Sequence, residues 1–125
     1  MRRLLIVEDH EMSRTMLRRR LRRLGFEVLS AADGREGVLT AMGQVPDLIV
    51  LDLTLPVMDG YAAARLLKAD DRTRAIPIVA LTAQAMVGDR ERALEAGCDS
   101  YEIKPLNFDR LLEKIDGLIT AEDLP

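Results

Sequence analysis

Five short apolar runs alternate with segments of helical spacing, and this alternation limits the possible folds more than any other feature of the chain. The apolar runs lie at residues 3–7, 27–31, 47–51, 78–82 and 100–103. Most are apolar at successive positions, which is typical of parallel strands that helices cover on both faces. The segments between them are long enough for right-handed crossovers. The sequence therefore predicts an α/β domain with a five-stranded parallel sheet.

Cap and turn residues mark the ends of the predicted helices. Asp33, Asp59 and Asn107 are suited to begin helices as N-caps, and Gly25 and Gly97 are suited to end them. The predicted helices cover residues 12–24, 34–42, 88–96 and 108–118, and a further helix begins at residue 60. We expect one domain over residues 1–119 and a short polar tail over residues 120–125.

Composition argues against several classes of protein. Hydrophobic residues make up 48% of the chain, enough for one sizeable core, and the net charge of -3 does not favour direct binding of nucleic acid. No apolar run approaches the length of a membrane span, and the single cysteine, Cys98, cannot form an internal disulfide. We therefore expect a cytoplasmic protein that does not bind a membrane, with Cys98 as a small buried residue.

Positive charge is concentrated near the N-terminus. Eight of the 18 Lys and Arg residues lie between residues 2 and 23. The simplest interpretation is the solvated face of a helix whose buried side contains Leu17, Leu21 and Leu24, with Met12 and Met16 also packed. The alternative is a docking surface for an acidic partner.

Polar residues follow four of the five predicted strands. Glu8 and Asp9 come after the first strand, Asp52 after the third, Thr82 at the end of the fourth and Lys104 after the fifth. In an open α/β sheet, ligands bind beyond the carboxyl ends of the strands, which lie at one edge. We therefore expect three carboxylates, one hydroxyl and one ammonium group to converge there.

This set of groups suits phosphoryl transfer. Carboxylate oxygens that share a site with water favour Mg²⁺, and a cation would keep Asp52 ionised beside its acidic neighbours. An ionised aspartate can act as a nucleophile and form an aspartyl phosphate. The electron-rich transition state needs donors around the phosphoryl oxygens, and Lys104 and Thr82 would supply them.

Taken singly, these and other polar residues have ordinary explanations. Carboxylates are common near helix N-termini, and we interpret Asp33 and Asp59 as helix caps. His10 is interpreted as a partly exposed residue of a first helical turn, rather than as a metal ligand or a phosphorelay histidine. Asp52 fits such explanations least, because apolar residues flank it on both sides.

Four motifs resemble those of the receiver domain of bacterial two-component response regulators, the CheY-like family. They are VED at residues 7–9, PDLIVLDLTLPVMDG at 46–60, ALTA at 80–83 and YEIKP at 101–105. The resemblance extends over about residues 3–119. It implies a flavodoxin-like (βα)5 fold with strand order 2-1-3-4-5.

The resemblance also implies roles for the residues of the predicted site. Asp52 corresponds to the phosphoacceptor and Lys104 to the lysine that pairs with the phosphoryl group. Glu8, Asp9 and Asp52 correspond to the Mg²⁺ ligands, with Asp9 binding directly and Glu8 often through water. The backbone carbonyl of Thr54 would complete the ligands from the protein.

Further residues correspond to the switch of this family. Thr82 matches the hydroxyl that bonds the phosphoryl oxygen, Ala83 the small residue after it, and Tyr101 the aromatic residue that swings inward on activation. A cis peptide bond is expected before Pro105. Thr54 and Gln84 occupy positions that tune autodephosphorylation. The chain departs from the usual pattern at Glu102, where an apolar residue is more common, and this difference bears on which partner reads that surface.

The implied function is a phosphorylation switch. A histidine kinase or histidine phosphotransfer protein would donate the phosphoryl group, and the surface around the fourth helix, the fifth strand and the last helix would control a protein output partner or effector domain. The chain would catalyse only its own phosphotransfer and autodephosphorylation, either alone or as part of a larger protein.

Two alternative functions remain. An unphosphorylated receiver-like interaction module typically lacks one of the acids, the threonine or the lysine, all of which this chain has. A phosphatase of the haloacid dehalogenase type needs an Asp two positions after the nucleophile, where this chain has Thr54.

Overall fold

Five parallel strands form one sheet in the order β2-β1-β3-β4-β5. The strands are β1 (Arg3–Val7), β2 (Glu27–Ala31), β3 (Leu48–Asp52), β4 (Ile78–Thr82) and β5 (Ser100–Ile103). A computed structural model describes residues 2–83 and 87–123, with side chains as far as residue 119. Its topology is the flavodoxin-like order that the resemblance implied.

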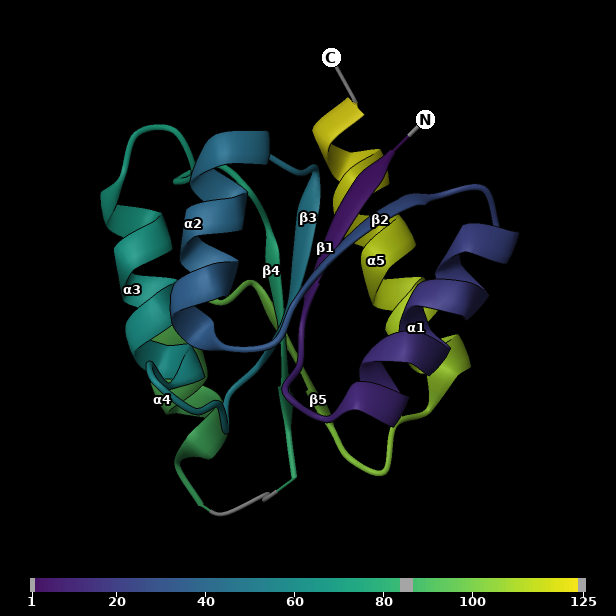
Figure 1. Ribbon diagram of the computed structural model, residues 1–125. Helices are drawn as coiled ribbons and strands as arrows, with labels where there is room; N and C mark the ends of the chain where they lie inside the picture. Colours follow the sequence, from purple (N-terminus) through teal and green to yellow (C-terminus); the bar gives the residue numbers. More distant parts are fainter. Residues whose placement is uncertain (1, 84–86, 124–125) are drawn as a thin grey trace.

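Helices cover both faces of the sheet (Figure 1). One face carries α1 (Glu11–Arg23) and α5 (Phe108–Asp123), and the other carries α2 (Gly34–Gln44), α3 (Gly60–Ala69) and α4 (Asp89–Glu95). Side chains of β1 alternate between two cores: Leu4 and Ile6 pack beneath α1 and α5, while Leu5 and Val7 pack beneath α2 and α3. Burial on both faces explains why the strands are apolar at successive positions.

Local polar contacts begin the helices where the sequence predicted. A side-chain oxygen accepts a hydrogen bond from the backbone N–H three residues later, which satisfies one of the free donors of the first turn. The pairs are Asp33 with Glu36 at 2.8 Å, Asp59 with Ala62 at 2.9 Å, and Asn107 with Arg110 at 3.0 Å. Gly25 and Gly97 follow α1 and α4 with φ of 98° and 106°, a conformation that glycine adopts without steric cost.

Several element boundaries differ from the predictions by one or two residues, and the end of α5 differs by five. β3 begins and ends one residue later than expected, so Asp52 is the last residue of the strand itself. α5 continues to Asp123, beyond the predicted end at residue 118, because residues 119–123 contain neither glycine nor proline to stop it. The backbone of residues 120–123 is therefore helical. Among the described residues, no helix is long and apolar enough to cross a membrane.

The packing predicted for α1 is partly wrong. Leu17 and Leu21 are buried, but Leu24 is 54% exposed because it lies beyond the last turn, at the C-cap. Met12 and Met16 are 71% and 57% exposed. At 100° per residue they lie about 140° around the helix from the two buried leucines, so they face away from the sheet.

Candidate functional site

A cleft of about 340 Å³ opens at the carboxyl edge of the sheet. In Figure 1 this is the edge toward which the strand arrows point. The lining residues come from the β1–α1 loop and the first turn of α1, from the end of β3 and the loop after it, from the residue after β4 and from the loop after β5: Glu8, Asp9, His10, Ser13, Asp52, Thr54, Ala83 and Lys104. The fold thus brings together both acids of the VED motif, the acid of β3 and the lysine of the YEIKP motif.

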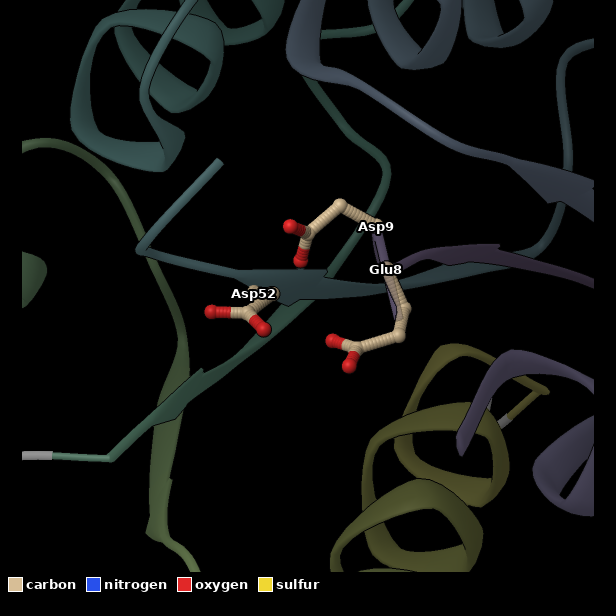
Figure 2. Close-up of side chains that lie close together, drawn as sticks. All are labelled: Glu8, Asp9 and Asp52. Carbon is tan, nitrogen blue, oxygen red and sulfur yellow. The ribbon is translucent and has the colours of Figure 1, made fainter. Parts of the chain in front are cut away.

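Three carboxylates meet in this cleft (Figure 2). Glu8 and Asp9 at the end of β1 and Asp52 at the end of β3 each offer an oxygen, and these oxygens lie within 4.8 Å of one another. Glu8 and Asp52 are buried and Asp9 is exposed. Hard oxygen ligands with one side open to water fit Mg²⁺, which keeps several waters when it binds a protein.

Both oxygens of Asp52 have hydrogen-bond partners, although the residue is only 3% exposed. The backbone N–H of Thr54 donates to Oδ1 at 2.8 Å, and the Lys104 ammonium donates to Oδ2 at 2.7 Å. Burial alone would raise the pKa of Asp52, but its bonds with Glu8, Lys104 and Thr54 outweigh burial and hold that pKa below 3.8. A buried strand can therefore end on an ionised carboxylate, as a nucleophile requires.

The pKa of Glu8 is shifted in the opposite direction from that of Asp52. The pKa of Glu8 is raised from 4.5 to about 7, mainly by burial and then by Asp52, and Lys104 offsets only part of this rise. Lys104 lies 3.2 Å from Glu8 but 2.7 Å from Asp52. The lysine therefore pairs mainly with Asp52. Glu8 is partly protonated near neutral pH, and a divalent cation bound there would displace this proton.

The β1–α1 loop is held by a residue that sequence analysis assigned to the basic surface. Arg14 donates from Nη1 to the backbone carbonyls of Glu8 at 2.8 Å and of Asp9 at 3.3 Å. No sequence motif marks this contact. His10 caps α1, with Nδ1 accepting from the Ser13 N–H at 3.4 Å, and it lies outside the carboxylate cluster found among the described residues. Both observations support its structural interpretation.

A family model described as the response regulator receiver domain matches residues 4–116. The chain belongs to this family. A curated relative, the polar-differentiation response regulator DivK of Brucella anthropi, is 39% identical over 111 residues, which cover 89% of this chain and 90% of the relative. Receiver domains are signalling domains rather than conventional enzymes.

Solved receiver domains have the same structure. That of a sensor histidine kinase of Pseudomonas aeruginosa PAO1, described with a magnesium ion in its active-site cleft, is 40% identical with a TM-score of 0.88, and the match covers 95% of this chain and 98% of that one. The receiver domain of a signal transduction histidine kinase from Syntrophus aciditrophicus is 33% identical with a TM-score of 0.92, covering 100% and 95% of the two chains.

Two predicted switch residues of this receiver domain lie just beyond the cleft. Thr82, the last residue of β4, is 4% exposed and forms a side-chain hydrogen bond with Tyr101 of β5. Burial raises the pKa of Tyr101, and its ring packs against the core beneath α2, α3 and α4. Ala83 lines the cleft, the bond before Pro105 is cis, and Gln84 lies outside the described residues.

Tyr101 also lines a second hollow of the receiver domain, the α4–β5–α5 groove, which has a volume of about 820 Å³. Its lining residues come from the N-terminal side of α4, from β5 and from α5: Val87, Gly88, Arg90, Glu91, Leu94, Asp99, Ser100, Tyr101, Ile103 and Lys114. The bond between Thr82 and Tyr101 thus joins the edge of the acidic cleft to this groove.

Glu102 of β5 is 2% exposed, and such a buried position usually holds an apolar residue, so its carboxylate needs compensating partners. Arg110 donates to it at 3.2 Å, and Lys114 donates both to its other oxygen and to the Tyr101 carbonyl. These contacts went unpredicted. The spacing of Arg110 and Lys114, four residues apart on one helix face, is the signal that could have indicated them.

Proposed function

We propose that this receiver domain accepts a phosphoryl group from phosphohistidine on Asp52 and in response changes the surface formed by α4, β5 and α5. One observation carries the proposal. The Lys104 ammonium lies 2.7 Å from Asp52, inside a cleft whose three carboxylates can share one cation.

The reacting groups have distinct parts in the transfer. One carboxylate oxygen of Asp52 forms the bond to phosphorus, while the phosphorus–nitrogen bond of the donor breaks and its electron pair returns to the imidazole. Lys104 stays beside the new phosphoryl oxygens and offsets their charge. Thr82 reaches the same oxygens with its hydroxyl.

The residues of the cleft also fit a divalent cation. Mg²⁺ bound by Asp9, Asp52 and the Thr54 carbonyl, with Glu8 acting through water, would neutralise charge on the phosphoryl oxygens. The magnesium described in the cleft of the Pseudomonas aeruginosa relative supports this assignment.

The contact between Thr82 and Tyr101 can transmit a change at Asp52 to the α4–β5–α5 groove. When Thr82 turns toward a phosphoryl group, it gives up its present bond with Tyr101. The tyrosine then changes the wall of the groove that it shares with α4 and α5. Phosphorylation shifts the equilibrium between two existing arrangements of these side chains, and an output protein binds the two arrangements with different affinity.

The first prediction tests the chemistry. Incubation with acetyl phosphate and Mg²⁺ is expected to add the mass of one phosphoryl group, measured by mass spectrometry of the intact protein. Chelation with EDTA should prevent the gain, because the charge on the phosphoryl oxygens is then not neutralised. A gain that is unaffected by EDTA would contradict the proposed site, and the absence of any gain would favour the unphosphorylated module.

The donor is proposed to dock on a surface made by α1 and the loop after β5. A hollow of about 240 Å³ lies there beside Lys104, and its wall includes Met16, Arg20 and Phe108. The Arg20 guanidinium lies 3.8 Å from the centre of the Phe108 ring. Arg18 and Arg22 instead donate hydrogen bonds to Ser30 and to the Val28 carbonyl of β2. The arginines of α1 therefore divide between a side that contacts β2 and a side that faces the hollow.

The second prediction tests this docking surface. The double variant Arg19→Glu with Arg20→Glu is tested with a phosphorylated kinase or phosphotransfer protein that phosphorylates the wild type. We expect it to accept the phosphoryl group about tenfold more slowly, because its new negative charges repel an acidic donor. Its rate with acetyl phosphate should not change. The matched control is Arg65→Glu with Arg74→Glu, two exposed positions away from α1. Equal loss with both donors, or equal loss in the control, would reject the surface.

A further inference from the structure

The loop between β3 and α3, residues 53–59, is pressed against the first turn of α2 at one point. A Cβ atom built on Gly34 would lie 2.0 Å from the carbonyl oxygen of Met58 and 2.9 Å from its carbonyl carbon. Both atoms belong to the backbone, so a side chain at this position can be accommodated only if the loop or the helix moves. Gly34 is therefore a contact between α2 and this loop.

We propose that Gly34 is a positioning residue for the cation site. Its missing side chain lets α2 support Met58, and this support holds Thr54 where it lines the acidic cleft. The inference rests on the proposed function, because it concerns the same cation. It adds a residue that neither touches the cation nor lies in the cleft.

The two ends of the loop are tied together independently of α2. The Gly60 N–H donates to the Leu53 carbonyl at 3.1 Å. A Cβ on Gly60 would lie 2.4 Å from the Asp52 carbonyl oxygen, so α3 begins directly against the end of β3. These contacts fix the two ends of the loop against the end of β3. They do not hold the tip of the loop, around Val57 and Met58.

The tip of the loop has a conformation that needs such support. The Met58 N–H donates to the Pro56 carbonyl at 2.7 Å, which closes a tight turn around Val57. Val57 has φ of 69°, and a β-branched residue is rarely found there because its side chain crowds the backbone. Strained conformations persist only where the surroundings enforce them. Gly34 lies outside the loop and packs against the backbone of Met58, next to the strained residue.

Thr54 connects the loop to the acidic cleft. Its N–H donates to Oδ1 of Asp52 at 2.8 Å, and the residue lines the cleft. If a methyl group on Gly34 displaces Met58, the residues between the fixed ends of the loop, from Thr54 to Met58, must take up the shift. The Thr54 carbonyl then leaves its position relative to the three carboxylates, and cation affinity falls.

The test is Gly34→Ala, with Mg²⁺ binding measured by calorimetry in the absence of any phosphodonor. We expect the dissociation constant for Mg²⁺ to rise about tenfold, the size of effect seen when a group that orients a ligand is lost. The rate of phosphorylation by acetyl phosphate should recover substantially at saturating Mg²⁺. Gly43→Ala is the matched control, because it lies in the same helix with nothing within 4 Å of its added Cβ.

Two further variants separate positioning from general destabilisation. Ile115→Val trims a fully buried side chain of α5 and should lower the melting temperature while leaving the Mg²⁺ dissociation constant unchanged. Met58→Ala removes the side chain that anchors the loop to the core but leaves α2 unaltered, so it should weaken Mg²⁺ binding even if Gly34→Ala does not fold.

The outcomes also distinguish this inference from the proposed function. Wild-type Mg²⁺ affinity in Gly34→Ala, or equal weakening in Ile115→Val, would overturn the positioning role. If Gly34→Ala weakens Mg²⁺ binding while the wild type accepts no phosphoryl group, the positioning role stands and the phosphoacceptor function fails.

Discussion

Asp52→Asn is expected to abolish the phosphoryl gain from acetyl phosphate and Mg²⁺ while the protein stays folded. The amide is a poor nucleophile, and at the end of β3 it keeps the shape of the carboxylate and a hydrogen bond from the Thr54 N–H. Intact-protein mass spectrometry measures the loss, and the melting temperature shows that the fold is retained.

A matched variant separates the nucleophile from other aspartates of the same segment. Asp59 caps α3 through Oδ1, a bond that an asparagine oxygen also accepts. Asp59→Asn should therefore be phosphorylated like the wild type. A phosphoryl gain that survives in Asp52→Asn at normal speed would place the acceptor on another residue and remove the basis of the proposed function.

The same substitution should change the ionisation of Glu8. Repulsion and hydrogen bonding from Asp52 contribute to the raised pKa of Glu8, after burial as the main cause. With a neutral residue at position 52, we expect that pKa to fall and Glu8 to become the main partner of Lys104. NMR titration of the Glu8 carboxyl carbon measures this shift.

The parallel sheet and the edge that carries the site could be predicted from the alternation of apolar runs and helical segments, and the strand order came from the family resemblance. Parallel strands connected by helices place their carboxyl ends at one edge, so residues at the ends of β1, β3 and β5 lie along the same side of the sheet. This argument located Glu8, Asp52 and Lys104. The lysine nitrogen lies 2.7 Å from an oxygen of Asp52 and 3.3 Å from an oxygen of Glu8. It needed no detail of side-chain packing.

The surrounding contacts could not be predicted because they depend on how close two elements pack. Arg14 looks like one more arginine of a basic helix, yet it bonds to two loop carbonyls. Gly34 looks like the start of a helix, yet it matters through the backbone of Met58. The exposure of Met12 followed from how α1 lies on the sheet, which periodicity of apolar residues alone left ambiguous.

Lys104 supplies the positive charge beside the two buried carboxylates, Glu8 and Asp52. Its side chain is 27% exposed, while those of Glu8 and Asp52 are 1% and 4% exposed. Burial lowers the pKa of Lys104, but the two carboxylates raise it by more than burial lowers it, so the ammonium stays charged. Removing one partner of a buried ion pair costs far more than the pair contributes, because the other charge remains buried.

Lys104→Met is therefore expected to destabilise the protein strongly, and to do so in a pH-dependent way. The pKa of Glu8 is about 7 in the folded protein and 4.5 ordinarily, so its contribution to stability falls as pH rises between these values. Without the lysine the pKa of Glu8 rises further, and each carboxylate that ionises as the pH increases is left without a counter-charge. We expect a loss of about 2 to 3 kcal/mol in the free energy of unfolding at about pH 8, from urea denaturation in EDTA.

At about pH 5.5 the loss should be much smaller, because Glu8 is then protonated and only Asp52 remains charged. Saturating Mg²⁺ at about pH 8 should restore most of the stability, since it binds the folded protein and replaces the missing positive charge. In the double variant Asp52→Asn with Lys104→Met, the two losses should not add, because the charge that the lysine offsets is already gone. A loss independent of pH and of Mg²⁺ would instead assign Lys104 a packing role and leave the acidic cleft without its proposed counter-charge.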